Sequence, residues 1–175
     1  LALGMPFLFR NQDELVYVSQ QLRPLIETEL EQKGFKVLMW TAAGWVYFFS
    51  REPGSEPTDL QRQKLWVAST DPDILAAWRR AGFRIVELST TEVTLGLQTG
   101  LIDAVLTSPL IAAPYQWFGI TNNMNDLPIA PFYGALTIST RSWKRLPSKL
   151  RPQLLAAAYE AEQMATEEAL AADKS

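Results

Sequence analysis

Apolar residues recur at helical spacing near the start of the chain, after a polar stretch that includes Asn11. The apolar positions are Leu15, Val18, Leu22, Leu25, Ile26 and Leu30. Spacings of three and four residues predict an amphipathic helix, and Asn11 can cap its first turn. Pro24 interrupts the pattern because it lacks a backbone N–H and its ring obstructs the preceding turn. We therefore expect two short helices or one kinked helix, ending at Lys33 and Gly34.

Extended segments flank this helix. Met5–Phe9 is expected to be a buried extended segment or a turn into one. Phe35–Thr41 and Trp45–Ser50 are rich in aromatic and branched residues, which favour strands, and the small residues Ala42–Gly44 separate them. Arg51–Thr58 is polar and holds two prolines, which predicts a loop.

A regular alternation of strands and helices follows this loop. The predicted strands are Lys64–Ala68, Phe83–Leu88 and Ile102–Thr107, and the predicted helices are Asp71–Ala81 and a segment from Ser89 or Thr90 to Thr99. Gly82 and Gly100 stand where the helices should stop. Strand and helix in strict alternation indicate a parallel α/β sheet with right-handed crossovers.

The last third of the chain predicts a mixture of short elements and one long helix. A short helix should run from Pro109 to about Phe118, with strands near Gly119–Asp126 and Phe132–Thr140. A long helix is expected over Ser148–Ala172. Its predicted inner stripe is Leu150, Leu154, Ala158, Ala161 and Ala165.

Composition removes several classes of function. The 175 residues include no His and no Cys, with 16 basic and 19 acidic side chains. Catalytic triads, disulfides and most zinc sites are therefore excluded. No basic stripe supports nucleic-acid binding, and no apolar run reaches the roughly 18 residues of a membrane span. No acidic pair at catalytic spacing and no phosphate loop is visible, so we expect a protein that is not an enzyme and needs no cofactor or metal.

Four segments, in the same order and over most of the chain, resemble motifs of one family. They are Met5–Phe9 (lPFLF), Pro57–Val67 (P-x-DL-x-G-x-K-I-R-V), Thr91–Asp103 (E-V-Y-x-A-L-Q-x-G-x-V-D) and Ser139–Pro147 (S-x-x-x-W-x-x-L-P). The chain thus resembles the solute-binding receptors of TRAP transporters, of the DctP type. No single motif is specific, and the order and spacing of all four carry the resemblance.

The resemblance implies an α/β, periplasmic-binding-protein-like fold of type II, in which two lobes close on a small ligand, with a long C-terminal helix. We expect residues 1–50 and 127–175 to form parts of the first lobe, the interlobe strands and the long helix. Residues 51–126 should form the second lobe. Family members carry roughly a hundred residues before the lPFLF segment, about one small domain, so the fold would be incomplete and the chain an internal or C-terminal fragment.

The implied function is an extracytoplasmic receptor that captures a small ligand and delivers it to a TRAP membrane permease. The receptor would lie in the periplasm, free or lipid-anchored. An accessory periplasmic protein or a second copy of the chain are further partners. The alternative is a protein-interaction subunit of a transport complex that binds a partner protein through its aromatic surface.

The sequence departs from the family pattern where family members hold an organic acid. The family arginines of the I-R-V and G-F-R-x-F strands correspond to Trp66 and Val46, and the polar V-D-G-x-E-N-P segment becomes Ile102–Pro109. Burying a carboxylate without a cationic partner costs several kcal/mol, so the departures predict an apolar ligand in a hydrophobic cleft. The expected lining is Trp45, Val46, Trp66, Ala68, Leu106, Thr107 and Ser108.

Each of these positions also has a structural interpretation. Trp45, Val46 and Trp66 lie in predicted strands, where aromatic and branched side chains are favoured as plain core. Thr107 and Ser108 end a parallel strand, the place where α/β proteins bind ligands, yet Ser-Pro can also simply shape the turn. The sequence alone leaves both interpretations open.

Overall fold

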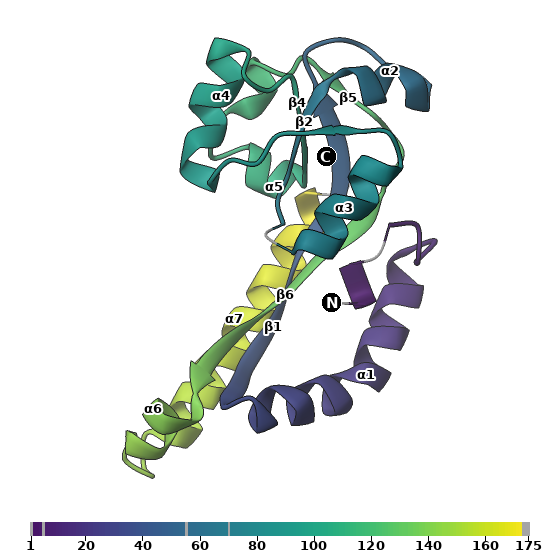
Figure 1. Cartoon of the computed structure of the whole chain (residues 1–175). Coiled ribbons are helices and arrows are strands. Elements are labelled where there is room, and N and C mark those ends of the chain that lie inside the picture. The colour runs from purple at the N-terminus through teal and green to yellow at the C-terminus, as the bar shows by residue number, and fades with distance from the viewer. Residues whose placement is uncertain (1, 5, 55, 70, 173–175) are drawn as a thin grey trace. The chain divides into compact units, whose positions relative to one another are not determined.

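The computed structural model describes residues 2–4, 6–54, 56–69 and 71–172 (Figure 1). The chain divides into two compact units. Unit 1 comprises Leu1–Gly44 and Ala130–Ser175, and unit 2 comprises Trp45–Ile129. Strand β1 (Phe35–Ser50) contributes residues to both units.

Unit 2 is built around a mixed sheet with the strand order β3-β2-β4-β1-β5. The strands are β2 (Lys64–Val67), β3 (Arg84–Ile85), β4 (Ala104–Thr107), the end of β1, and β5 (Asn123–Met124). β2 pairs in parallel with both β3 and β4, whereas β1 is antiparallel to β4 and β5. The predicted parallel α/β core, with helices between successive strands, is confirmed.

The helices of unit 2 are short. They are α2 (Pro57–Arg62), α3 (Pro72–Arg80), α4 (Val93–Thr99), α5 (Pro109–Ala112), and the 3₁₀ turns η2 (Thr90–Glu92) and η3 (Trp117–Gly119). The Asp71 side chain caps α3, and Ser89 with Glu92 forms a capping box before α4. Gly100 ends α4 at a φ of 73°, a conformation that favours glycine. Asp71, Ser89 and Gly100 thus stand at the predicted helix ends.

One face of the unit 2 sheet carries the main core. Phe49 and Trp66 both stand opposite Val105 in the sheet register, so the three side chains share a face. Helical and turn residues cover them: Val93, Leu97, Ile102, Ala112 and Trp117. All eight residues are buried, which accounts for the apolar spacing of the strands and helices in this part of the sequence.

Unit 1 consists of a strand pair and helices. Its elements are η1 (Ala2–Gly4), α1 (Gln12–Gln32), the first part of β1, β6 (Ala130–Ser139), α6 (Thr140–Arg145) and α7 (Arg151–Ala172). β6 pairs with β1. Asn11 accepts a hydrogen bond from the backbone N–H of Glu14 at 2.9 Å, as the predicted cap requires. Pro24 lies inside a single helix that bends along its length in Figure 1, so the prediction of one kinked helix holds.

Several predicted boundaries were wrong. The two strands predicted on either side of Ala42–Gly44 form one strand, which passes through Gly44 at a φ of 76° and pairs with β6 as well as with β4 and β5. Helix α2 begins in the predicted polar loop, and the strand predicted over Phe83–Leu88 keeps only Arg84 and Ile85. Helix α6, which Ser139 caps, was not predicted, and the long helix begins at Arg151 and not at Ser148.

The predicted burial of two terminal segments also needs correction. Phe7 is 62% exposed and Leu8 is exposed as well, while Phe9 is buried, so only the end of the Met5–Phe9 segment enters the core. Met5 itself lies outside the described residues. In α7, Ala158 is buried but Ala161 is exposed, and Leu150 is exposed and precedes the helix, so the predicted inner stripe is only partly internal.

Candidate functional site

The carboxyl ends of the parallel strands β2 and β4 lie side by side in unit 2. Val67 stands opposite Leu106 in the register, so Ala68 and Thr107 each follow directly at the same end of the sheet. Tyr47 of β1 stands opposite Thr107. In α/β sheets this end is where ligands bind, because the loops that leave it can surround a small molecule. The predicted pair Thr107 and Ser108 therefore lies at the edge of the sheet where a solute is expected.

Thr107 and Ser108 carry buried hydroxyl groups without a partner. Both residues are 0% exposed, and Thr107 Oγ1 and Ser108 Oγ have no hydrogen-bond partner among the described residues. Ser108 stands at the N-cap position of α5, but its side chain makes no capping hydrogen bond. A buried polar group left unpaired costs about 1–3 kcal/mol. The fold thus holds two adjacent hydrogen-bonding groups in an unsatisfied state.

Trp66 is a core residue of unit 2. Its side chain is 5% exposed, and its Nε1–H donates to the Leu88 carbonyl at 3.0 Å. The ring meets Trp117 edge-on, with the ring centroids 5.8 Å apart. Trp117 in turn donates from Nε1 to Thr94 Oγ1 at 2.9 Å. The indole N–H groups are thereby satisfied inside the fold, and Trp66 presents no polar group to a ligand.

The other predicted lining residues fall on different faces of the sheet. Leu106 stands opposite Phe48 in the register, and Val46 shares that face because it lies two residues before Phe48. Trp45 shares the opposite face with Tyr47 and Thr107 by the same alternation. Trp45 and Leu106 are buried, Val46 is half-buried and Ala68 is exposed.

The seven predicted site residues therefore do not form one continuous surface. The structure brings together Thr107, Ser108 and Ala68 at the strand ends, with Trp66 behind them in the core of the unit. A cavity of about 370 Å³ does occur in unit 2, but it has a polar lining at the other end of the sheet.

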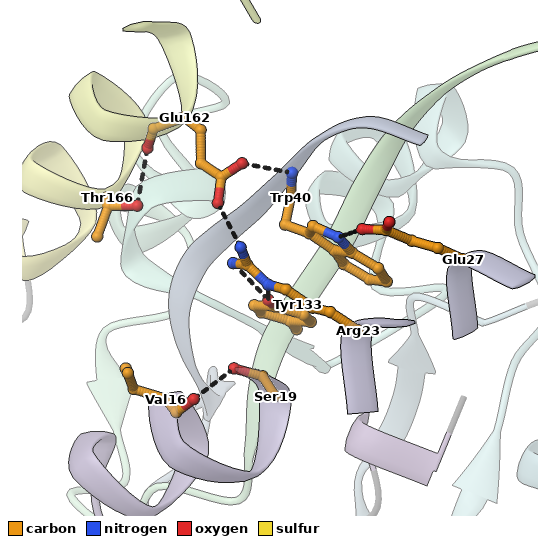
Figure 2. A network of polar contacts seen from close by, with 8 residues as sticks. All are labelled: Val16, Ser19, Arg23, Glu27, Trp40, Tyr133, Glu162 and Thr166. Atoms are coloured by element: carbon orange, nitrogen blue, oxygen red, sulfur yellow. Dashed lines mark hydrogen bonds and ion pairs between the residues drawn. The ribbon is translucent and has the colours of Figure 1, made fainter. Parts of the chain in front are cut away.

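Sequence reasoning missed a polar network in unit 1, which Figure 2 shows. Arg23 of α1 pairs with Glu162 of α7 at 2.8 Å. Its Nε and Nη2 donate to the Tyr133 hydroxyl of β6 at 3.1 and 3.0 Å. Glu162 also accepts the backbone N–H of Trp40 in β1 at 3.1 Å, and the Trp40 indole donates to Glu27 at 2.8 Å. The network joins α1, β1, β6 and α7.

The aromatic rings of this network add apolar contact to its charges. The Trp40 and Tyr133 rings stack, with their centroids 5.4 Å apart and an angle of 17° between the ring planes. The Arg23 guanidinium lies 5.7 Å from the Trp40 ring centroid. Burial lowers the pKa of Arg23, but the hydrogen bond to Tyr133 and the charge of Glu162 outweigh burial and raise that pKa above its ordinary value. The guanidinium is therefore a permanent cation that is paired within the unit, which indicates a structural role.

None of the described helices combines the length and the apolar character needed to cross a membrane. Likewise, no group of three or more acidic side chains within the described ranges could hold a metal ion.

Comparison with known proteins places these features in a family. Residues 1–175 match the family model DctP, described as bacterial extracellular solute-binding protein, family 7. The chain is 33% identical over 104 residues to the 2,3-diketo-L-gulonate-binding periplasmic protein YiaO of Escherichia coli. That match covers 58% of this chain and 31% of the relative.

Two solved structures are similar in fold. An extracytoplasmic solute receptor of Bordetella pertussis that binds pyroglutamic acid gives a TM-score of 0.85 at 23% identity, covering 95% of this chain and 55% of that one. A TRAP periplasmic solute-binding protein of Sulfurospirillum deleyianum with bound succinate gives a TM-score of 0.88 at 24% identity. That match covers 98% of this chain and 56% of the other chain. The predicted α/β fold class is confirmed, and the chain spans less than two thirds of the length of each of these proteins.

Proposed function

The chain belongs to the DctP family of bacterial extracellular solute-binding proteins, family 7, and on this premise we propose that it is the solute-binding part of a TRAP-type receptor. The receptor works outside the cytoplasm, binds one small molecule, catalyses no reaction and delivers its solute to a membrane permease. Units 1 and 2 belong to two different lobes of the receptor, close to the expected division at residues 50 and 127.

The solute is held at the carboxyl ends of β2 and β4. The observation that carries this assignment is the pair of buried, unpartnered hydroxyls on Thr107 and Ser108. Both hydroxyls are buried in this structure, so a ligand reaches them only when the strand ends make room for it. A hydrogen bond made there recovers the free energy that the ligand-free fold leaves unsatisfied. Ala68 lies exposed at the same end of the sheet, with room for direct contact.

The remaining lining residues act through packing. Trp66 and Leu106 fix the positions of the two strand ends from the core, and Trp45 and Val46 do the same for β1. A small shift of any of these side chains moves the hydroxyls of Thr107 and Ser108, because the strands are hydrogen-bonded neighbours.

The solute is mainly apolar, with an uncharged polar group that meets the hydroxyls. The relatives of known structure bind acids, pyroglutamic acid in one case and succinate in another. In this chain the position that corresponds to the family arginine of the I-R-V strand is Trp66, whose only polar atom is already bonded to Leu88. A carboxylate placed there finds no cation and loses its hydration.

Matched acids and amides test this proposal by isothermal titration calorimetry on the receptor. The two probes are pyroglutamic acid and succinate, each compared with its neutral amide. We expect the neutral amide of a pair to bind at least about tenfold more tightly than the acid, which corresponds to roughly 1.4 kcal/mol. Tighter binding of the acids in both pairs overturns the assignment of an uncharged solute. Binding that Thr107→Val leaves unchanged overturns the location.

A further inference from the structure

Unit 2 holds a recess at the end of the sheet opposite the proposed solute site. This cavity of about 370 Å³ is large enough for a small molecule. Its lining residues are Glu52, Pro53, Asp59, Arg62, Gln63 and Asp103. Gln63 directly precedes β2 and Asp103 directly precedes β4, whereas Ala68 and Ser108 directly follow these strands. Since β2 and β4 are parallel, the recess and the proposed solute site are separated by the length of the strands.

Gln63 brings a buried acceptor without a partner to this recess. The residue is 6% exposed, and its Nε2 donates to the Glu52 carbonyl at 3.1 Å. Its Oε1 has no hydrogen-bond partner among the residues that the structure describes. A buried amide oxygen normally has a donor, so a hydrogen bond to Gln63 Oε1 is missing from the described part of the fold.

The charges of the lining are balanced except at one residue. Arg62 lies 4.0 Å from Asp59, and Lys64 Nζ lies 3.6 Å from Asp103. For the Glu52 carboxylate the described part of the chain supplies no ion pair. The recess thus combines one uncompensated negative charge with one unsatisfied acceptor.

From these observations we propose that the recess binds the primary ammonium group of a small aliphatic amine. An ammonium carries a single positive charge and three N–H donors, so it can neutralise Glu52 and donate to Gln63 Oε1 together. Pro53 supplies an apolar wall for the alkyl chain. A divalent cation is a poorer match, because it would bring two charges to a recess with one unbalanced carboxylate.

Three probes of similar size test this proposal by NMR titration of the chain: n-butylamine, tetramethylammonium and n-butanol. We expect n-butylamine to produce saturable shifts at the Gln63 side-chain amide and the Glu52 backbone amide. Tetramethylammonium has the charge without N–H donors, and n-butanol has a donor without the charge. Both should bind at least about tenfold more weakly. Equal responses to n-butylamine and tetramethylammonium, or no saturable shift with n-butylamine, overturn the proposal.

Variants locate the amine on the recess. Glu52→Gln removes the unbalanced charge from an exposed side chain and should lower the affinity for n-butylamine about tenfold. Asp126→Asn removes one negative charge from another exposed position of unit 2 and should change the affinity less than about twofold. Gln63→Met should weaken the binding of n-butylamine and leave the binding of tetramethylammonium unchanged. Equal effects of Glu52→Gln and Asp126→Asn would overturn the assignment of the amine to this recess, without bearing on the solute site.

Discussion

Trp66 donates its indole N–H to the backbone carbonyl of Leu88, with 3.0 Å between nitrogen and oxygen. This bond links β2 to the segment that leads into α4, inside the main core of unit 2. The family motif that the sequence resembles carries an arginine at this position. In this chain the position serves packing, and the proposed site relies on the buried, unpartnered hydroxyls of Thr107 and Ser108 at the end of β4.

Substitutions at Trp66 should separate packing from charge. Trp66→Arg places a cation in the apolar core without a partner, and we expect it to destabilise the fold by at least about 3 kcal/mol. Trp66→Phe keeps an aromatic ring but leaves the Leu88 carbonyl without its donor, at a cost of about 1–3 kcal/mol. Urea unfolding followed by tryptophan fluorescence measures both changes. A Trp66→Arg protein as stable as the parent would show that the position opens onto solvent.

Thr107→Val should raise stability and lower solute affinity together. The substitution replaces a buried hydroxyl with a methyl group of the same shape, so the free energy of unfolding of the ligand-free protein should rise by about 1 kcal/mol. Solute binding should weaken because one polar contact is lost. Thr94→Val is the matched control, since the Thr94 hydroxyl accepts from Trp117 and its loss should destabilise the protein. Loss of stability in Thr107→Val would reveal a partner for that hydroxyl within the fold.

The network in unit 1 should contribute more to stability than an exposed ion pair. Glu162→Gln removes a carboxylate that contacts both Arg23 and the Trp40 backbone, and we expect a loss of about 1–2 kcal/mol. Glu87→Gln breaks the exposed pair with Arg79 and should cost less than about 1 kcal/mol. Chemical denaturation of both variants gives the comparison. Equal effects would show that burial and the shared hydrogen bonds do not strengthen the Arg23–Glu162 pair.

The capping box before α4 should be visible in the titration of Glu92. The hydroxyl and the backbone N–H of Ser89 donate to the Glu92 carboxylate and lower its pKa below the ordinary value. A lowered pKa means that these bonds stabilise the fold above the ordinary pKa and are lost as the pH falls through the lowered one. Carbon-detected NMR should show the shift, and Ser89→Ala should move the pKa back upward. A Glu92 pKa that Ser89→Ala does not change would assign the shift to another cause.

Local signals in the sequence predicted the caps and helix ends of unit 2, because Asp71, Ser89 and Gly100 act through their own backbone neighbourhood. Helix α2 escaped prediction because its N-cap is Glu56, a residue seldom found at that position. The continuity of β1 through Gly44 depends on pairing with strands far along the sequence, so no local pattern contains it.

The position of the proposed site rests on the rule that ligands bind where parallel strands end, and the structure places Thr107 and Ser108 at the end of β4. The motif comparison did not predict on which face of the sheet each lining residue lies. Motifs match residues by position in the sequence, whereas alternate residues of a strand point to opposite faces. Glu162 was missed for a different reason. It is one of four glutamates in the alanine-rich helix α7, and nothing in the local sequence distinguishes it from the other three. Only its ion pair with Arg23, far away in the sequence, identifies it as an internal residue.

Native mass spectrometry of the receptor, purified from its host without denaturation, tests the central proposal most directly. The account predicts one co-purified small molecule per chain that carries no carboxylate and that is lost or weakened in Thr107→Val. A dicarboxylate or sugar acid bound in equal amount by the parent and by Thr107→Val would contradict both the solute class and its position.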